Sequence, residues 1–183
     1  MKKVCVFLAP GFEEVEGLTV VDLLRRAGAE LSMVSIEETR TIAGTHGITV
    51  EADKLLDEVN YAEQDLLVLP GGMPGTLNLK NCDKLLDILR DFNSQGKMLA
   101  AICAAPTVFG HMGILAGKKA TCYPGCEDGL NGAEYVVQNV VIDGNITTSR
   151  GIGTAIDFSL SLIAQLYDQA KADELAEGIV YKA

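Results

Sequence analysis

Three short segments of the sequence carry residues whose types could do chemistry together: "APGFEEVE" (9–16), "LPGG" (69–72) and "AICAAP" (101–106). In the third segment Cys103 follows a strand-like run, precedes a helix-like run and has alanines close on both sides. A nucleophile at a sharp strand-to-helix turn needs small neighbours of this kind, as in the hydrolase motif G-x-S-x-G. Cys103 is therefore a candidate nucleophile, and a buried structural cysteine is the alternative.

The backbone near this cysteine could supply an oxyanion hole. The residue after a nucleophile at such a turn, here Ala104, donates its N–H. A second N–H could come from Gly72, because two adjacent glycines allow a close backbone approach. A thiol at the start of a helix is also favoured as thiolate, so we expect a depressed pKa for Cys103.

An acidic side chain is placed where a helix should be apolar. Glu16 lies at helical spacing from Val20 on the apolar face of the helix predicted over residues 13–27. We expect that face to pack on the sheet, so that Glu16 points inward and stays protonated. Glu13 shares this face, whereas Glu14 is expected to point away.

The sequence does not identify a base for the thiol. His111 lies eight residues after Cys103 on the same predicted helix, roughly 12 Å along its axis, which is too far. His46 lies in a hairpin or extended excursion predicted over residues 39–53, and there we expect a solvated surface residue. A Cys-His mechanism needs a histidine within reach of the thiol, so the base is left open.

Composition excludes several kinds of partner. With 25 acidic and 15 basic residues the net charge is −10, which repels nucleic acids and anionic membranes. No apolar run approaches the roughly 18 residues of a membrane span. The N-terminal "MKKVCVFLAPGFEEVEG" turns acidic after a short apolar run, which indicates a first strand and not a signal peptide. We therefore expect a cytoplasmic protein.

We expect neither a metal nor a cofactor. "CYPGC" (122–126) could hold a redox pair or metal ligands, but zinc needs three or four ligands and the chain has two histidines. "GIG" (151–153) lacks the third glycine of a dinucleotide fingerprint, and the carboxylates of residues 13–16 repel phosphate. The odd number of cysteines argues against a disulfide framework: Cys5, Cys82, Cys103, Cys122 and Cys126.

Alternating strands and helices position these groups. A length of 183 residues with 48% hydrophobic content suits one domain over residues 1–183. Such alternation predicts an α/β fold, a parallel sheet between helix layers, with ligands bound beyond the carboxyl ends of the strands. We expect strands over 3–9, 29–36, 65–72 and 97–102, a hairpin over 139–149, and helices over 13–27, 83–96, 103–113, 154–167 and 170–178.

Several motifs in this order resemble the ThiJ/PfpI superfamily, the family of the Parkinsonism-associated protein deglycase: "LAPGFEEVE", "VVDLLRRAG", "LVLPGG", "AAICAAPTV", "NG" and "TTSRGIGTAIDF". The resemblance implies a flavodoxin-like three-layer sandwich, as in class I glutamine amidotransferase domains, with a nucleophile-elbow cysteine. It implies that Cys103 is an oxidation-sensitive nucleophile, that protonated Glu16 hydrogen-bonds it, and that Gly72 and Ala104 are the oxyanion-hole donors. It also implies a homodimer, with the first helix near the twofold axis.

The chain departs from that family at two positions. Peptidase members carry histidine directly after the cysteine, where this chain has Ala104, so a cysteine peptidase is the weakest reading. Deglycase-like members often have histidine before a proline in the strand after the nucleophile, where this chain has Tyr123. A phenol, with a pKa near ~10, donates a hydrogen bond but is a poor base at neutral pH.

Two functions remain. The first is a cofactor-independent glyoxalase or deglycase acting on methylglyoxal-type dicarbonyls or their thiol and amine adducts, in which Cys103 adds to the aldehyde and Glu16 moves the proton. The second is a non-enzymatic oxidative-stress sensor or chaperone, in which Cys103 is oxidised to a sulfinate. Production of lactate from methylglyoxal discriminates between them.

Overall fold

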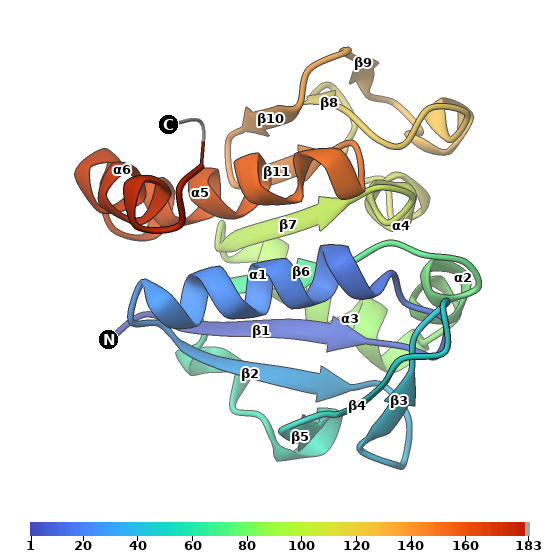
Figure 1. Ribbon diagram of the computed structural model, residues 1–183. Helices are drawn as coiled ribbons and strands as arrows, with labels where there is room; N and C mark the ends of the chain where they lie inside the picture. The colour runs from blue at the N-terminus through green and yellow to red at the C-terminus, as the bar shows by residue number, and fades with distance from the viewer. Residues whose placement is uncertain (182–183) are drawn as a thin grey trace.

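A seven-stranded, mostly parallel sheet forms the centre of the computed structural model, which describes residues 1–181 (Figure 1). Its strand order is β10-β11-β7-β6-β1-β2-β5, and β10 alone runs antiparallel to its neighbour. The strands are β1 (Lys3–Leu8), β2 (Glu30–Ser35), β5 (Lys54–Leu55), β6 (Leu66–Leu69), β7 (Met98–Ile102), β10 (Val140–Asp143) and β11 (Ile146–Ser149).

Helices cover both faces of this sheet, so the predicted flavodoxin-like sandwich is confirmed. The helices α1, α5 and α6 pack on one face, and α2, α3 and α4 pack on the other. The helices are α1 (Glu14–Arg26), α2 (Gly75–Lys80), α3 (Asp83–Ser94), α4 (Pro106–His111), α5 (Ala155–Leu166) and α6 (Gln169–Gly178). Within residues 1–181 no helix is both long and apolar enough to cross a membrane.

Two short strand pairs and several 3-10 turns lie outside the central sheet. The excursion over residues 39–53 holds an antiparallel pair, β3 (Thr41–Ala43) and β4 (Thr49–Glu51). A second pair, β8 (Lys119–Ala120) and β9 (Glu134–Tyr135), is parallel. Single 3-10 turns occur at Leu56–Glu58, Tyr61–Glu63, Glu127–Gly129 and Ile152–Thr154.

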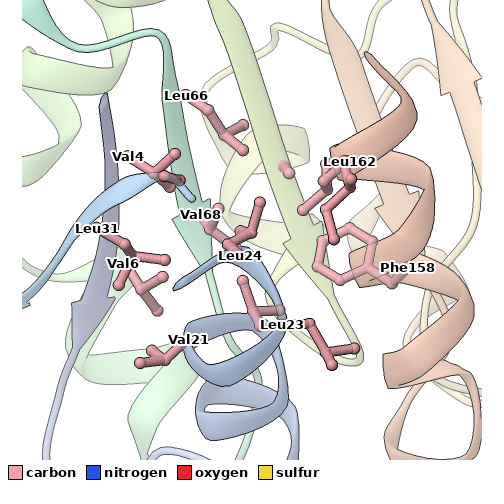
Figure 2. Close-up of a cluster of buried hydrophobic side chains, with 14 of the residues drawn as sticks. Val4, Val6, Val21, Leu23, Leu24, Leu31, Leu66, Val68, Phe158 and Leu162 are labelled. Atoms are coloured by element: carbon pink, nitrogen blue, oxygen red, sulfur yellow. The ribbon is translucent and has the colours of Figure 1, made fainter. Parts of the chain in front are cut away.

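Alternate residues of the central strands fill two separate cores. Val4 and Val6 of β1 face α1 and α5, whereas Cys5 and Phe7 face the other helix layer. Figure 2 shows the first core, in which Leu24 of α1 and residues of α5 close over the strands. Strands buried on both faces are why these segments are continuous apolar runs in the sequence.

Helix boundaries differ from the prediction around the candidate nucleophile. The helix expected to begin at Cys103 begins instead at Pro106, because proline suits the first helical position, where its missing N–H costs nothing. The helix α2 was not predicted, since its six residues are too few to show a period. Cys103 therefore lies outside helix α4, in the turn that precedes it.

The sheet brings four strand ends together. Ala101 of β7 pairs with Leu69 of β6 and with Thr148 of β11, so these strands end at one level. The strand β1 lies on the far side of β6. All four strands are parallel, and the arrowheads of β1 and β7 point the same way in Figure 1, so the residues that follow the strands lie at one edge of the sheet.

Candidate active site

Cys103 occupies a strained turn between β7 and α4. Its φ is 65°, in the left-handed region that non-glycine residues rarely adopt. The Cys103 N–H donates to the Ser149 carbonyl at 3.0 Å, and the Cys103 carbonyl accepts from the Tyr123 N–H at 2.8 Å. Such strain persists where the surroundings fix it, and it is common at functional sites.

Glu16 lies beside this thiol, as its helical spacing predicted. Its side chain is almost fully buried, at 1% exposure. The carboxylate Oε2 accepts a 3.0 Å hydrogen bond from the Gly71 N–H, and the carboxyl group also interacts with the Cys103 thiol. Glu16 Oε1 is buried and has no conventional hydrogen-bond partner in residues 1–181.

The two acids share a dry environment that disfavours charge. Burial raises the pKa of Glu16 to about 7, although hydrogen bonds from Cys103 and the Gly71 N–H oppose the shift. Burial also raises the pKa of Cys103 to about 12, and the charge and hydrogen bond of Glu16 add to it. The depressed thiol pKa expected from a helix terminus is therefore wrong, because desolvation exceeds the effect of a six-residue helix that starts later.

Two backbone N–H groups point at the sulfur. The N–H groups of Gly72 and Ala104 hydrogen-bond the Cys103 thiol and act to lower its pKa. These are the donors that the sequence suggested for an oxyanion hole. The same N–H groups can stabilise negative charge on the sulfur or on an oxygen bound next to it.

The two glycines of "LPGG" are required because a side chain at either position would collide with neighbouring atoms. A Cβ on Gly71 would lie 2.5 Å from the Cys103 Cβ and 2.6 Å from Glu16 Oε2. Gly72 has a φ of +92°, and a Cβ there would lie 2.3 Å from the Glu13 backbone nitrogen. The sequence analysis assigned a role to Gly72 and missed Gly71, which holds Glu16 in place.

A cavity of about 570 Å³ opens onto the thiol. It brings together residues that follow β1, β7 and β11 with residues from two loops: Glu13, Glu16, His46, Cys103, Tyr123, Pro124, Arg150, Gly151, Ile152, Gly153 and Thr154. The Tyr123 side chain is 52% exposed and lines this cavity. Arg150, in "TTSRG" after β11, is a lining residue to which the sequence analysis gave no role.

The helical spacing predicted that Glu14 points away from the molecule, and this prediction is wrong. Its side chain is 3% exposed because the turn between β3 and β4 folds over the start of α1. Oε1 accepts from the His46 N–H at 2.7 Å, and Oε2 lies 3.0 Å from His46 Nδ1. Glu14 therefore fastens the excursion to the helix and brings His46 to the cavity.

His46 is solvated, as expected, but it also belongs to the site. Its side chain is 66% exposed. The hydrogen bond to Glu14 and the charge of Glu13 raise the pKa of His46. His111 lies at the end of α4 and is absent from the residues lining the cavity.

Possible metal ligands gather at one place in residues 1–181. Ligand atoms of Glu13, Glu14 and His46 lie within 4.8 Å of one another. The contacts of Glu14 with the β3–β4 turn account for this arrangement. Cys122 is buried and Cys126 is half-buried, and burial raises the pKa of both thiols.

Comparison with known sequences gives a consistent assignment. A model of the DJ-1/PfpI family matches residues 2–165. The protein named Protein DJ-1 homolog B, from Arabidopsis thaliana, is 42% identical over 183 residues, and Protein dj-1beta of Drosophila melanogaster is 37% identical over 181 residues. Deglycase PH1704 of Pyrococcus horikoshii is 40% identical over 151 residues.

The extent of these matches differs. The alignment with the Arabidopsis protein covers 99% of this chain but 42% of that protein. The alignment with the Drosophila protein covers 98% of this chain and 97% of that protein. For the Pyrococcus protein the shares are 81% and 89%. The chain thus spans less than half the length of the first two curated relatives it matches, both from Arabidopsis.

Solved structures show the same fold. A cysteine-to-alanine mutant of a DJ-1 superfamily protein from Salmonella typhimurium superposes with a TM-score of 0.96 at 36% identity, covering 100% of both chains. An oxidized DJ-1 of Toxoplasma gondii also gives 0.96, at 37% identity and 100% coverage of both chains.

Proposed function

The chain belongs to the DJ-1/PfpI family, and we propose that it is a cofactor-independent glyoxalase or deglycase acting through Cys103 on small 2-oxoaldehydes or their thiol and amine adducts. The pairing of Cys103 with a buried Glu16 of raised pKa, beneath two N–H donors, carries the proposal. A carboxyl group with a pKa of about 7 can both give and take a proton at neutral pH.

The first step forms a hemithioacetal. The pair loses one proton to give the Cys103 thiolate beside protonated Glu16, and in that state the carboxylate no longer repels the sulfur. The thiolate adds to the aldehyde carbon, and the electron pair of the C=O bond moves to oxygen. That oxygen lies against the N–H groups of Gly72 and Ala104 and takes the proton from Glu16.

The second step isomerises the adduct. Ionised Glu16 removes the proton from the carbon that carries the sulfur, and the resulting enediol is reprotonated at the neighbouring carbon to give a thioester. Water then attacks the thioester, the Cys103 thiolate leaves, and a 2-hydroxy acid is released; methylglyoxal gives lactate. One carboxyl group at the reacting carbon suffices for both proton transfers.

The deglycase activity would use the same first step. In an adduct of an aldehyde with a thiol or amine, the former aldehyde carbon carries that thiol or amine. Cys103 would attack this carbon and displace the original thiol or amine from it. The similarity to Deglycase PH1704 supports including such adducts among the substrates.

A redox sensor or chaperone is the second candidate. The half-buried Cys103 thiol faces two N–H donors and a protonatable carboxyl group, which could hold the oxygens of a sulfinate. Ala104 follows the cysteine where a peptidase would need a base, so we do not propose peptidase activity.

Turnover separates the candidates. Purified protein is incubated with methylglyoxal, and lactate is measured against Cys103→Ala and Glu16→Gln. We expect lactate from the native chain and none above background from either variant. Equal lactate from native chain and Cys103→Ala would mean that Cys103 has no catalytic role and would refute the enzyme proposal.

We further propose that the chain forms a homodimer through α1. A surface cavity of about 600 Å³ is lined by Leu18, Asp22 and Arg26 of α1 together with Ile156 and Ile179. Apolar and charged side chains side by side on one helix are suited to an interface between identical chains. We also retain as predictions a single domain over residues 1–183 and a cytoplasmic location.

A further inference from the structure

Arg150 lies at the edge of the Cys103 cavity and has no carboxylate partner among the residues that the structure describes. It follows β11 directly and lines the cavity. Its Nε is buried without any hydrogen-bond partner, and its guanidinium forms no ion pair within residues 1–181. A buried donor left unpaired is costly, and native structures rarely leave one so. Arg150 also lines the cavity, so its guanidinium is a donor group with which a ligand there can pair.

Neighbouring acidic groups are engaged elsewhere. Glu127 is close enough for the charge of Arg150 to help lower its pKa, but its two oxygens accept from the Gly125 N–H at 3.0 and 2.8 Å. Glu14 and Glu13 lie beside His46, whose Nδ1 is 3.0 and 3.7 Å from their carboxylate oxygens. Of the acidic residues that line the cavity, Glu13 lies beside His46 and Glu16 beside Cys103 and the Gly71 N–H, so neither forms an ion pair with Arg150 within residues 1–181.

We propose that Arg150 binds the carboxylate of the substrate, so that the cavity selects 2-oxoaldehydes that also carry a carboxylate beyond the ketone carbon. The inference rests on the proposed function, because it names the substrate class of that site. A guanidinium presents parallel N–H donors that match the two oxygens of a carboxylate. A neutral methyl group in the same place would leave the guanidinium without a charged partner.

The three recognition elements act on three parts of such a molecule. The Cys103 thiolate forms a bond with the aldehyde carbon, and the C=O electron pair moves to oxygen, which takes the proton of Glu16. The N–H groups of Gly72 and Ala104 hold that oxygen. Arg150 holds the carboxylate throughout, so it contributes to binding and orientation, and it exchanges no proton.

Alkylation of Cys103 tests the inference without requiring turnover. Iodoacetate and iodoacetamide have nearly the same size and differ in charge, and in each the thiolate displaces iodide. Rates at Cys103 are followed by peptide mapping, and the ratio of the iodoacetate rate to the iodoacetamide rate is compared with that of a free cysteine peptide. We expect the ratio to be about tenfold higher in the protein, equivalent to about 1.4 kcal/mol.

Substitutions locate the cause of that preference. Arg150→Gln should lower the ratio about tenfold and Arg150→Lys less, because lysine keeps the charge without the paired donors. Arg90→Gln is the matched control, since it removes the same charge from an exposed ion pair on α3. Acetate should protect Cys103 from iodoacetamide in the native chain, and inorganic phosphate should not.

Several results would overturn the inference. One is a native ratio equal to that of the free peptide, and another is failure of both reagents to reach Cys103. A third is an Arg150→Gln ratio no lower than that of Arg90→Gln; if Arg150→Gln does not fold, Arg150→Lys and the native ratio decide. Protection by phosphate alone would mean a phosphoryl site. Because no lactate is measured here, loss of the glyoxalase proposal and loss of this one are separate outcomes.

Discussion

The Cα of Gly71 stands where any side chain would collide with Cys103: an added Cβ would lie 2.5 Å from the Cys103 Cβ. The Gly71 N–H also supplies the 3.0 Å hydrogen bond to Glu16 Oε2. One residue without a side chain therefore sets the spacing of the two groups on which the proposed chemistry depends.

Gly71→Ala should disable the site. The added methyl group must push Cys103 or Glu16 away, at a cost of about 1–3 kcal/mol in unfolding free energy, typical of overpacking. We expect alkylation of Cys103 by iodoacetamide to change severalfold and lactate production to be lost. Gly178→Ala is the control, because a Cβ there meets nothing within 4 Å. A fully active Gly71→Ala protein would contradict the described geometry.

Glu16→Gln should separate thiol reactivity from turnover. The amide removes the carboxylate charge and the hydrogen bond that raise the pKa of Cys103, and its NH₂ can donate to the sulfur. The thiol pKa should therefore fall, and alkylation at pH 8 should be about tenfold faster, as expected for a shift of about one pKa unit. Thiolate absorbance against pH measures the shift. A higher thiol pKa in Glu16→Gln would contradict the assignment.

Burial of Glu16 should also make folding depend on pH. Its pKa rises from an ordinary 4.5 to about 7 in the folded chain, so between these values the unfolded chain binds fewer protons. Stability must then fall as pH rises through this window and level off above about 7. The contribution is about 3 kcal/mol at most. Urea unfolding of the native chain and Glu16→Gln at pH 5 and 8 should show their difference changing in this direction.

Peroxide should oxidise Cys103 before the other cysteines. Burial raises the pKa of Cys5, Cys122 and Cys103 alike to about 12, but Cys5 and Cys122 are fully buried and have no N–H donor in residues 1–181 that opposes the shift. Cys103 has two such donors and opens onto the cavity. Peptide mapping after graded peroxide gives the order. Earlier oxidation of Cys126, which is also half-buried, would weaken both proposed functions.

Glu14→Gln should free the turn that carries His46. The hydrogen bond that His46 donates to Glu14 is the largest cause of the raised pKa of His46, so the variant should lower that pKa. Any stability that His46 gains by protonation is present at low pH and lost as pH rises through its folded pKa. The ring proton resonance of His46 followed by NMR against pH reports the change. An unchanged titration would mean that the hydrogen bonds between Glu14 and His46 do not persist in solution.

Leu18→Glu should weaken the proposed dimer. The residue lines the surface cavity between α1 and α6, so a buried charge there would oppose association. Light scattering at micromolar concentration should show a dimer for the native chain and a smaller species for the variant. A native monomer would refute the proposal directly.

Periodicity was enough to predict the layered fold. Runs such as residues 3–9 are apolar throughout because β1 is covered on both faces, and the spacing of Glu16 and Val20 placed the carboxyl group inward. These properties are local to one element, so the sequence exposes them.

Properties that depend on two distant segments were missed. Glu14 is buried by a turn some thirty residues away, which no helical periodicity can show. The thiol pKa of Cys103 was predicted in the wrong direction because desolvation comes from the whole surroundings, whereas the helix start is visible locally. Gly71 and Arg150 gain their roles only when the ends of β6 and β11 meet Cys103.

The backbone hydrogen bond between Tyr123 and Cys103 bears on how an active site of this kind can change in evolution. The Tyr123 N–H fixes the Cys103 carbonyl, while its side chain, 52% exposed, lines the cavity. Any residue except proline supplies that N–H. A single codon change at position 123 can thus exchange phenol, imidazole or amide beside the thiol while the elbow stays intact, and new reactivity becomes accessible in one mutational step.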